Sequence, residues 1–222
     1  FFFTPPFCLV LLDFLLKGCF FFFFRKENFW VFNVLGGQPL AIGQATHIAV
    51  SVANAINQSY ASHESVNLVP VLTGGMPFGT SLAMELERLA PGKWRLAPIF
   101  ASSYSGDEMV GASFIEIPQK FGESVDFQAP VIIIDDLLDT GITMNVLVHR
   151  MKQCGFEQVA VCVLVDKPSR RKNDLTPDFR ALVSPSDAWL VGYGMDTQMH
   201  YRALDAIYAM DLPPAAGETD LS

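Results

Sequence analysis

The stretch Val131-Ile-Ile-Ile-Asp-Asp-Leu-Leu-Asp-Thr-Gly-Ile-Thr143 decides the fold class of this chain. Its four β-branched and apolar opening residues predict a strand that is buried on both faces, as in a parallel sheet. From Thr143 onward apolar residues recur at helical spacing, and Gly155 stands where a helix C-cap is expected. A second apolar run, from 159 to 165, completes a β-α-β unit. We therefore expect an α/β fold with a mainly parallel sheet.

The residues at the end of this predicted strand suit a ligand that combines a sugar with a phosphate. Ligands of open parallel sheets bind outside the carboxyl ends of the strands. Free backbone amides at the start of the next helix attract anions, Gly141 permits a tight turn there, and Thr140 and Thr143 add hydroxyl donors. Asp135 and Asp136 repel phosphate, but they can accept hydrogen bonds from a vicinal diol and stabilise positive charge on a ribose ring.

Asp139 is then left to act as an acid or base beside the reacting centre. The alternative is a strand that ends in solvated acids before an ordinary capped helix, but the clustering of three acids and two threonines favours a ligand site. No G-x-x-x-x-G-K-[ST] sequence occurs, and no G-x-G-x-x-G opens a first βα turn. An ordinary nucleotide triphosphatase and a dinucleotide-binding site are therefore disfavoured.

The segment from Asp135 to Thr143 resembles the phosphoribosyl-pyrophosphate (PRPP) loop of the type I phosphoribosyltransferases. Further segments in matching order narrow the resemblance to the hypoxanthine-guanine branch of purine salvage. They are Leu72-Thr-Gly-Gly75, Ser102-Ser-Tyr104, Leu164-Val-Asp-Lys-Pro-Ser-Arg-Arg171 and Trp189-Leu-Val-Gly-Tyr-Gly-Met-Asp196, with Arg202 beyond. The match covers about residues 40 to 212. It implies the type I phosphoribosyltransferase fold, a mainly parallel twisted sheet flanked by helices with a small hood subdomain.

The resemblance also implies an activity and a set of site residues. The activity is transfer of the 5-phosphoribosyl group from PRPP to hypoxanthine or guanine, giving IMP or GMP and pyrophosphate. Asp139 matches the residue that takes the proton from the purine. The residues that match the PRPP site are Asp135, Asp136, Asp139, Thr140, Gly141, Ile142, Thr143, Thr73, Gly74 and Arg202.

Other matched positions concern the base, the metal and a lid. Lys167 matches the lysine that binds the 6-oxo group of the purine, Trp189 the aromatic residue that stacks on it, and Leu190 a backbone contact to its edge. Without the resemblance, Lys167 would be taken as a solvated lysine and Trp189 as a core residue. Asp196 matches a family residue that lies near the purine and binds Mg²⁺, and Asp135 and Asp136 are further acids for the metal. Ser103 and Tyr104 match the tip of a mobile lid.

Three positions depart from the family pattern. Asp135 stands where many relatives have Glu, Ile142 stands at a variable position that is Lys in some relatives, and Thr73 replaces a basic residue that is common at its turn. In the family the peptide at that turn is often cis. None of the three changes removes a named catalytic role.

Composition sets limits on partners and cellular location. The net charge of −8 argues against a surface that binds nucleic acid. Cys154 and Cys162 sit in apolar patterns and are predicted to be core residues in a reducing compartment. We expect a cytoplasmic enzyme of small-molecule substrates, not bound to a membrane, and the family implies a homodimer or homotetramer.

The expected domain organisation has three parts. Residues 1–37 form an atypical segment that holds 12 of the 19 Phe, residues 38–212 form the phosphoribosyltransferase domain, and residues 213–222 form a disordered tail. Residues 1–37 fit either a membrane anchor or translated sequence upstream of the true start. The second reading is favoured, because charged residues and prolines interrupt the apolar runs.

Outside the opening unit, the patterns predict helices near 45–56 and 79–89, strands near 67–72, 97–102 and 110–117, and an irregular polar segment from 168 to 186. Two other functions stay open. One is a phosphoribosyltransferase for xanthine or another base, and the other is a non-catalytic regulator of the same fold that binds PRPP or a nucleotide.

Overall fold

The computed structural model describes residues 25–26, 29–30, 45–103, 113–184 and 187–210. The expected tail at 213–222, Tyr104 and most of the Phe-rich segment at 1–37 lie outside these ranges. Within the Phe-rich segment, β1 (Arg25–Lys26) pairs antiparallel with β2 (Phe29–Trp30). In the described part of the chain, no helix is both long enough and apolar enough to cross a membrane.

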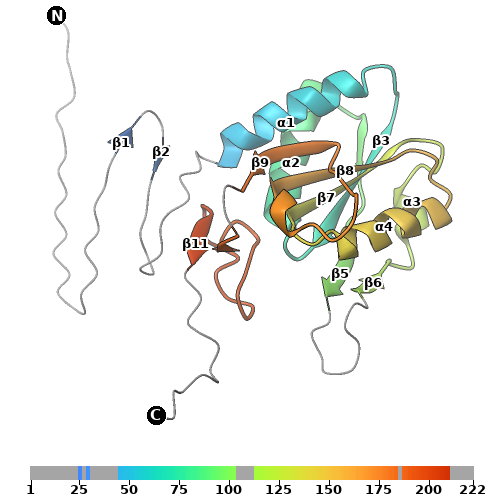
Figure 1. The fold of residues 1–222 in the computed structure, drawn as a ribbon. Helices are drawn as coiled ribbons and strands as arrows, with labels where there is room; N and C mark the ends of the chain where they lie inside the picture. Colours follow the sequence, from blue (N-terminus) through green and yellow to red (C-terminus); the bar gives the residue numbers. More distant parts are fainter. Residues whose placement is uncertain (1–24, 27–28, 31–44, 104–112, 185–186, 211–222) are drawn as a thin grey trace, which may run out of the picture.

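A sheet of seven strands forms the centre of the described part of the chain, in the order β6-β5-β3-β7-β8-β9, with β4 also paired to β3 (Figure 1). All these pairs are parallel except β5 with β6. The strands are β3 (Val66–Leu72), β4 (Trp94–Leu96), β5 (Ile99–Ser103), β6 (Ser113–Glu116), β7 (Val131–Leu138), β8 (Val159–Asp166) and β9 (Phe179–Val183). The predicted mainly parallel α/β sheet is confirmed.

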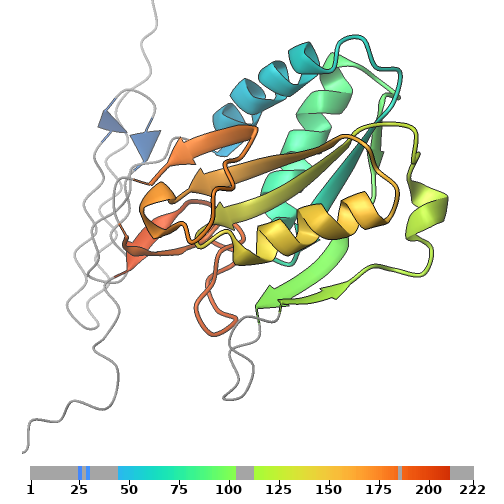
Figure 2. The same cartoon turned by 45° about the vertical axis from the view of Figure 1, so that its right-hand side comes forward.

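Helices cover both faces of this sheet. The helices are α1 (Ala45–Ser59), α2 (Met76–Leu89), α3 (Phe121–Ser124), α4 (Ile142–Gln153) and the short 3-10 helix η1 (Pro168–Arg170). Side chains alternate along β7: Ile132 and Ile134 pack in one core with α1 and α2, whereas Val131 and Ile133 pack in the other core with α4. Figure 2 shows α1 and α2 on one face and α4 on the other. Because β7 is apolar on both faces, it takes the central position that its sequence predicted.

A small hood lies apart from the main sheet and beside its carboxyl ends (Figure 1). Its strands β10 (Trp189–Val191) and β11 (Tyr208–Met210) pair antiparallel. Leu190, Met195 and Ile207 join the core that α1 and α2 form with the sheet. The hood is therefore anchored to the main domain by buried apolar contacts.

The structure corrects several local predictions. β7 continues through Asp135 to Leu138, because it remains paired with β8 as far as Asp166, so the first two acids lie within the strand. The expected strand at 97–102 begins only at Ile99, as β5, after Pro98, which lacks an amide donor. β4, just before it at Trp94–Leu96, was not predicted, and both strands pair with β3.

Two further corrections concern the segment after 153. β9 arises in the stretch that was expected to be irregular; it is a half-exposed edge strand without a continuous apolar pattern. Cys162 is buried as predicted, but the prediction for Cys154 is wrong, since it is exposed at the end of α4.

Candidate active site

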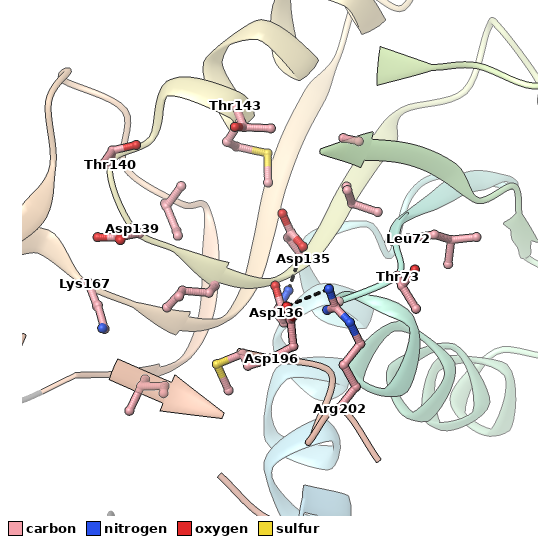
Figure 3. Close-up of a pocket in the computed structure, with 18 of the residues that line it drawn as sticks. Leu72, Thr73, Asp135, Asp136, Asp139, Thr140, Thr143, Lys167, Asp196 and Arg202 are labelled. Carbon is pink, nitrogen blue, oxygen red and sulfur yellow. Dashed lines mark hydrogen bonds and ion pairs between the residues drawn. The ribbon is translucent and has the colours of Figure 1, made fainter. Parts of the chain in front are cut away.

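A cavity of about 630 Å³ opens at the carboxyl ends of β3, β7 and β8, between the sheet and the hood (Figure 3). It collects nearly all the predicted site residues whose side chains the structure describes. Those that line it are Thr73, Gly74, Asp135, Asp136, Asp139, Thr140, Gly141, Thr143, Lys167, Trp189, Leu190, Asp196 and Arg202. These residues come from segments far apart in the sequence, so the fold alone brings them together.

Asp135 and Asp136 lie at the centre of the cavity, at the end of β7 (Figure 3). The backbone amide of Asp136 donates a 2.9 Å hydrogen bond to Oδ1 of Asp135. Burial raises the pKa of the Asp135 carboxyl well above its usual range, and the negative Asp136 adds to the rise. Burial raises the pKa of Asp136 as well, against the opposing charge of Arg202. A cationic centre in the cavity would relieve this unfavourable burial of negative charge.

The turn from Thr73 to Gly75 joins β3 to α2 and lies against the acid pair. The Leu72–Thr73 peptide is cis, as the family resemblance predicted for this turn. A Cβ atom added to Gly74 would overlap the carboxylate of Asp136, so a side chain at this position would push the acid aside. The turn and the acids therefore form one continuous wall of the cavity.

The start of α4 forms a second turn on the cavity wall. Gly141 is its N-cap residue and has a φ of +79°, a left-handed conformation that favours glycine. The Ile142 amide lies 3.4 Å from Oγ1 of Thr140, its hydrogen-bond acceptor. The amides of a first helical turn lack partners within the helix, so this turn suits an anion. Ile142 begins α4 but does not line the cavity.

Asp139 lies between the acid pair and this turn. Its Oδ1 accepts a 2.7 Å hydrogen bond from Nε of Arg170, which belongs to η1. Both side chains are partly exposed. The contact with Arg170 uses Oδ1, and Asp139 lines the cavity with a carboxylate that can accept a proton.

Lys167 and Trp189 also line the cavity, with Lys167 on the side of Asp139 and away from Thr73 and Arg202 (Figure 3). Lys167 is only 3% exposed, and its ammonium donates a 2.5 Å hydrogen bond to the carbonyl of Ala188. Burial lowers the pKa of Lys167, partly offset by the charge of Asp139. Trp189 is 43% exposed and Leu190, next to it in β10, is buried. Lys167 is thus not a solvated lysine, and Trp189 is not a core residue. The two side chains can receive a flat, polar ring.

Asp196 and Arg202 come from the turns that connect β10 to β11. Nη2 of Arg202 lies 2.6 Å from Oδ1 of Asp196, and its Nη1 donates a 2.6 Å hydrogen bond to the carbonyl of Gly194. The segment is not helical, and the Arg202 side chain is only 27% exposed. A Cβ atom on Gly194 would overlap the carbonyl oxygen of Gly74, which fixes these turns against the β3–α2 turn.

Comparison with known proteins agrees with this geometry. Residues 40–198 match the family model of the phosphoribosyl transferase domain. The chain belongs to the phosphoribosyl transferase family.

Individual similar proteins indicate which branch of the family the chain resembles. The chain is 32% identical over 151 residues to a hypoxanthine-guanine phosphoribosyltransferase of Bacillus subtilis, covering 68% of this chain and 79% of the relative. It is 30% identical over 160 residues to that of Aquifex aeolicus, covering 72% and 86%. The crystal structure of a hypoxanthine-guanine phosphoribosyltransferase from Bacillus anthracis is 27% identical, with a TM-score of 0.62 over 75% of this chain and 92% of that one. The predicted fold and resemblance are confirmed.

The residues predicted to form a lid lie at the edge of the described residues or beyond it. Ser103 is the last residue of β5, and Tyr104 falls outside the described ranges. Their assignment to a lid therefore stays a prediction.

The acids of the cavity suit a hard cation such as Mg²⁺. Asp135, Asp136 and Asp196 all line the cavity, and carboxylate oxygen is the ligand that Mg²⁺ prefers. Among the described residues, no three acidic, His or Cys side chains gather closely enough to hold a metal alone. Mg²⁺ commonly takes one or two protein carboxylates and completes its shell with water and substrate phosphate.

Several residues of the site were not predicted from the sequence. Met195 and Met199 line the cavity, and Arg170 binds Asp139. The methionines carry no periodic signal, because they lie in turns. Arg170 could have been suspected from its place in the Lys-Pro-Ser-Arg-Arg segment, but only the fold shows which acid it contacts.

Proposed function

We propose that this chain is a purine-salvage phosphoribosyltransferase that transfers the 5-phosphoribosyl group of PRPP to hypoxanthine or guanine. The products are IMP or GMP and pyrophosphate. The observation that carries the proposal is that one cavity contains two groups of residues. One is the buried Lys167 with the exposed Trp189, and the other is the acids at the end of β7 with the turn at Thr140 and Gly141. The first pair suits a 6-oxopurine, and the second group suits a phosphorylated ribose.

Each end of the cavity would bind one substrate. Lys167 would donate to the 6-oxo group of the base, and Trp189 would stack on the ring. Thr140, Gly141 and Thr143 would hold a phosphate of PRPP, while Arg202 would bind its pyrophosphate. The two substrates would meet above the end of β7.

The reaction would be a displacement at the anomeric carbon of the ribose. A nitrogen of the imidazole ring of the purine attacks this carbon, and the bond to pyrophosphate breaks. Asp135 and Asp136 would stabilise the positive charge on the ribosyl group, which their shared burial favours. Asp139 would accept the proton that the purine nitrogen loses. Asp135, Asp136 and Asp196 would each offer carboxylate oxygen to Mg²⁺, though not all three to one ion, and a bound ion would supply positive charge for the departing pyrophosphate.

The family resemblance further implies a cytoplasmic homodimer or homotetramer. Size-exclusion chromatography with light scattering measures the number of subunits directly.

One assay tests the proposed reaction. Purified protein is incubated with PRPP and Mg²⁺ together with hypoxanthine, guanine, xanthine, adenine or orotate, and each product is identified by its mass. We expect nucleotide from hypoxanthine or guanine. Product from xanthine or orotate alone would favour the enzyme for another base. PRPP binding without product from any base would favour the non-catalytic regulator.

A further inference from the structure

Arg171 ends the Lys-Pro-Ser-Arg-Arg segment, but it is not among the residues that line the cavity. Its side chain is 10% exposed and forms an ion pair with Oδ1 of Asp166, the last residue of β8, which is 1% exposed as a whole residue. A buried ion pair gains little net stability, because both charges lose their hydration. Stability alone therefore gives no reason for this arrangement at this point of the fold.

Arg171 packs against the back of the turn that Thr140 and Gly141 present to the cavity. A Cβ atom built on Gly141 would lie 2.8 Å from Cδ of Arg171 and 2.6 Å from Oδ1 of Asn173. The backbone amide of Lys172 donates a 2.9 Å hydrogen bond to the carbonyl of Thr140. The turn is thus enclosed between the cavity on one side and residues 171–173 on the other.

The charges behind the turn do not cancel. Asp166 accepts from Arg171 through Oδ1 and from Arg180 through Oδ2, the latter at 2.8 Å. Two guanidinium groups therefore share one carboxylate, which leaves an excess positive charge close to the turn. Within the described residues, Nη1 of Arg171 is buried and has no hydrogen-bond partner.

We propose that Arg171 is a positioning residue for the phosphate-binding turn. Anchored on Asp166, it supports Thr140 and Gly141 from behind and places positive charge near the phosphate that the turn receives. The inference deepens the proposed function, since it assumes that this turn binds the phosphate of the phosphoribosyl group. It predicts that loss of Arg171 weakens binding of that phosphate and spares both the base and the pyrophosphate.

The test compares Arg171→Lys with a matched control, Arg180→Lys. Arg180 binds the same carboxylate, but its side chain is half exposed, and the three atoms nearest to a Cβ built on Gly141 belong to Arg171 and Asn173. For each protein we would measure KM for PRPP and for hypoxanthine, and the affinity for ribose 5-phosphate and for magnesium pyrophosphate by calorimetry. Ribose 5-phosphate carries the phosphate of interest and lacks the pyrophosphate.

For Arg171→Lys we expect at least a tenfold rise in KM for PRPP and a similar loss of affinity for ribose 5-phosphate. KM for hypoxanthine and the affinity for pyrophosphate should stay within twofold, and Arg180→Lys should leave all four within twofold. Equal losses for all ligands, unchanged ribose 5-phosphate binding, or an equal effect of Arg180→Lys would overturn the proposal.

A second variant covers the case in which Arg171→Lys does not fold, as circular dichroism would report. Asn173→Ala removes the other group behind Gly141, and we expect a smaller loss of ribose 5-phosphate affinity, at least threefold; no loss would overturn the proposal. Failure of the proposed function would be seen separately, because the unaltered protein would then form no nucleotide product from any base. Calorimetry with ribose 5-phosphate tests Arg171 even then.

Discussion

At the scale of single residues, the acids at the end of β7 differ in their surroundings, and this separates their proposed roles. Asp135 and Asp136 are neighbours whose burial raises the pKa of each carboxyl. Asp139 is partly exposed and contacts Arg170. A buried pair suits stabilisation of a cation, whereas an accessible carboxylate suits proton transfer.

Substitution Asp139→Asn tests the role of the proposed base. The amide oxygen can still accept from Arg170, so the position of the side chain should be kept, but an amide cannot take a proton from the purine. We expect kcat to fall by about 10²–10⁴-fold and the affinity for PRPP, measured by calorimetry, to stay within threefold. Comparable losses in turnover and binding would instead assign Asp139 a structural role.

Substitution Asp135→Asn should stabilise the free protein at neutral pH. The folded state raises the pKa of this carboxyl, so it holds a proton that the unfolded chain releases above about pH 4. Stability is therefore lost as the pH rises from about 4 through the folded-state pKa. The asparagine variant has no carboxyl to ionise, so it does not lose this stability at high pH. Each kcal/mol of added unfolding free energy should raise Tm by roughly 2–4 °C.

Thermal unfolding without PRPP and Mg²⁺, at pH 4 and pH 8, measures this effect. The gain should be present at pH 8 and vanish toward pH 4. Asp174→Asn, which removes an exposed carboxylate, serves as the control and should change Tm little at either pH. A lower Tm for Asp135→Asn at pH 8 would contradict the argument.

At the scale of elements, the site depends on turns that approach one another through glycine. Gly194 has a φ of +105° and leaves no room for a side chain beside the carbonyl of Gly74. This contact joins the hood turns, which carry Asp196 and Arg202, to the turn between β3 and α2. The geometry of the pyrophosphate end therefore depends on one close backbone contact.

Substitution Gly194→Ala should disturb this end of the site more than the purine end. The backbone must shift to remove the overlap, and alanine is strained at this φ by roughly 1–3 kcal/mol. We expect KM for PRPP to rise at least tenfold and KM for hypoxanthine to rise less than threefold, as steady-state kinetics would show. Gly155→Ala, at a similar positive φ but with open space around it, is the control for strain alone.

At the scale of the whole molecule, the cavity belongs to the described domain. Among the residues that the structure describes, those lining the cavity all lie between Val71 and Arg202. We expect a chain that begins at residue 38 to keep its kcat and KM within twofold. Activity assays of this chain, expressed without detergent, measure the outcome. An insoluble or inactive product would show that the Phe-rich segment is part of the functional protein.

The sequence by itself determined the β-α-β unit, the mainly parallel sheet and the chemistry of the loop after it. These follow from local patterns: the apolar run 131–134, the helical spacing from Thr143, and the acids and threonines between them. Its family resemblance also indicated Lys167 and Trp189, although their surroundings could not be derived from spacing. Residue type and period suffice for such features, because they depend on neighbours in the chain.

Only the tertiary structure decided what depends on contacts between distant segments. It showed that β9 adds an edge strand, that Arg170 contacts Asp139, and that Arg171 supports the turn at Gly141 from behind. It also showed that Lys167 is buried and Trp189 exposed, the reverse of what each residue type usually does. The physical reason is that burial, ion pairing and close backbone approach are set by the packing of the whole fold, which no local pattern contains.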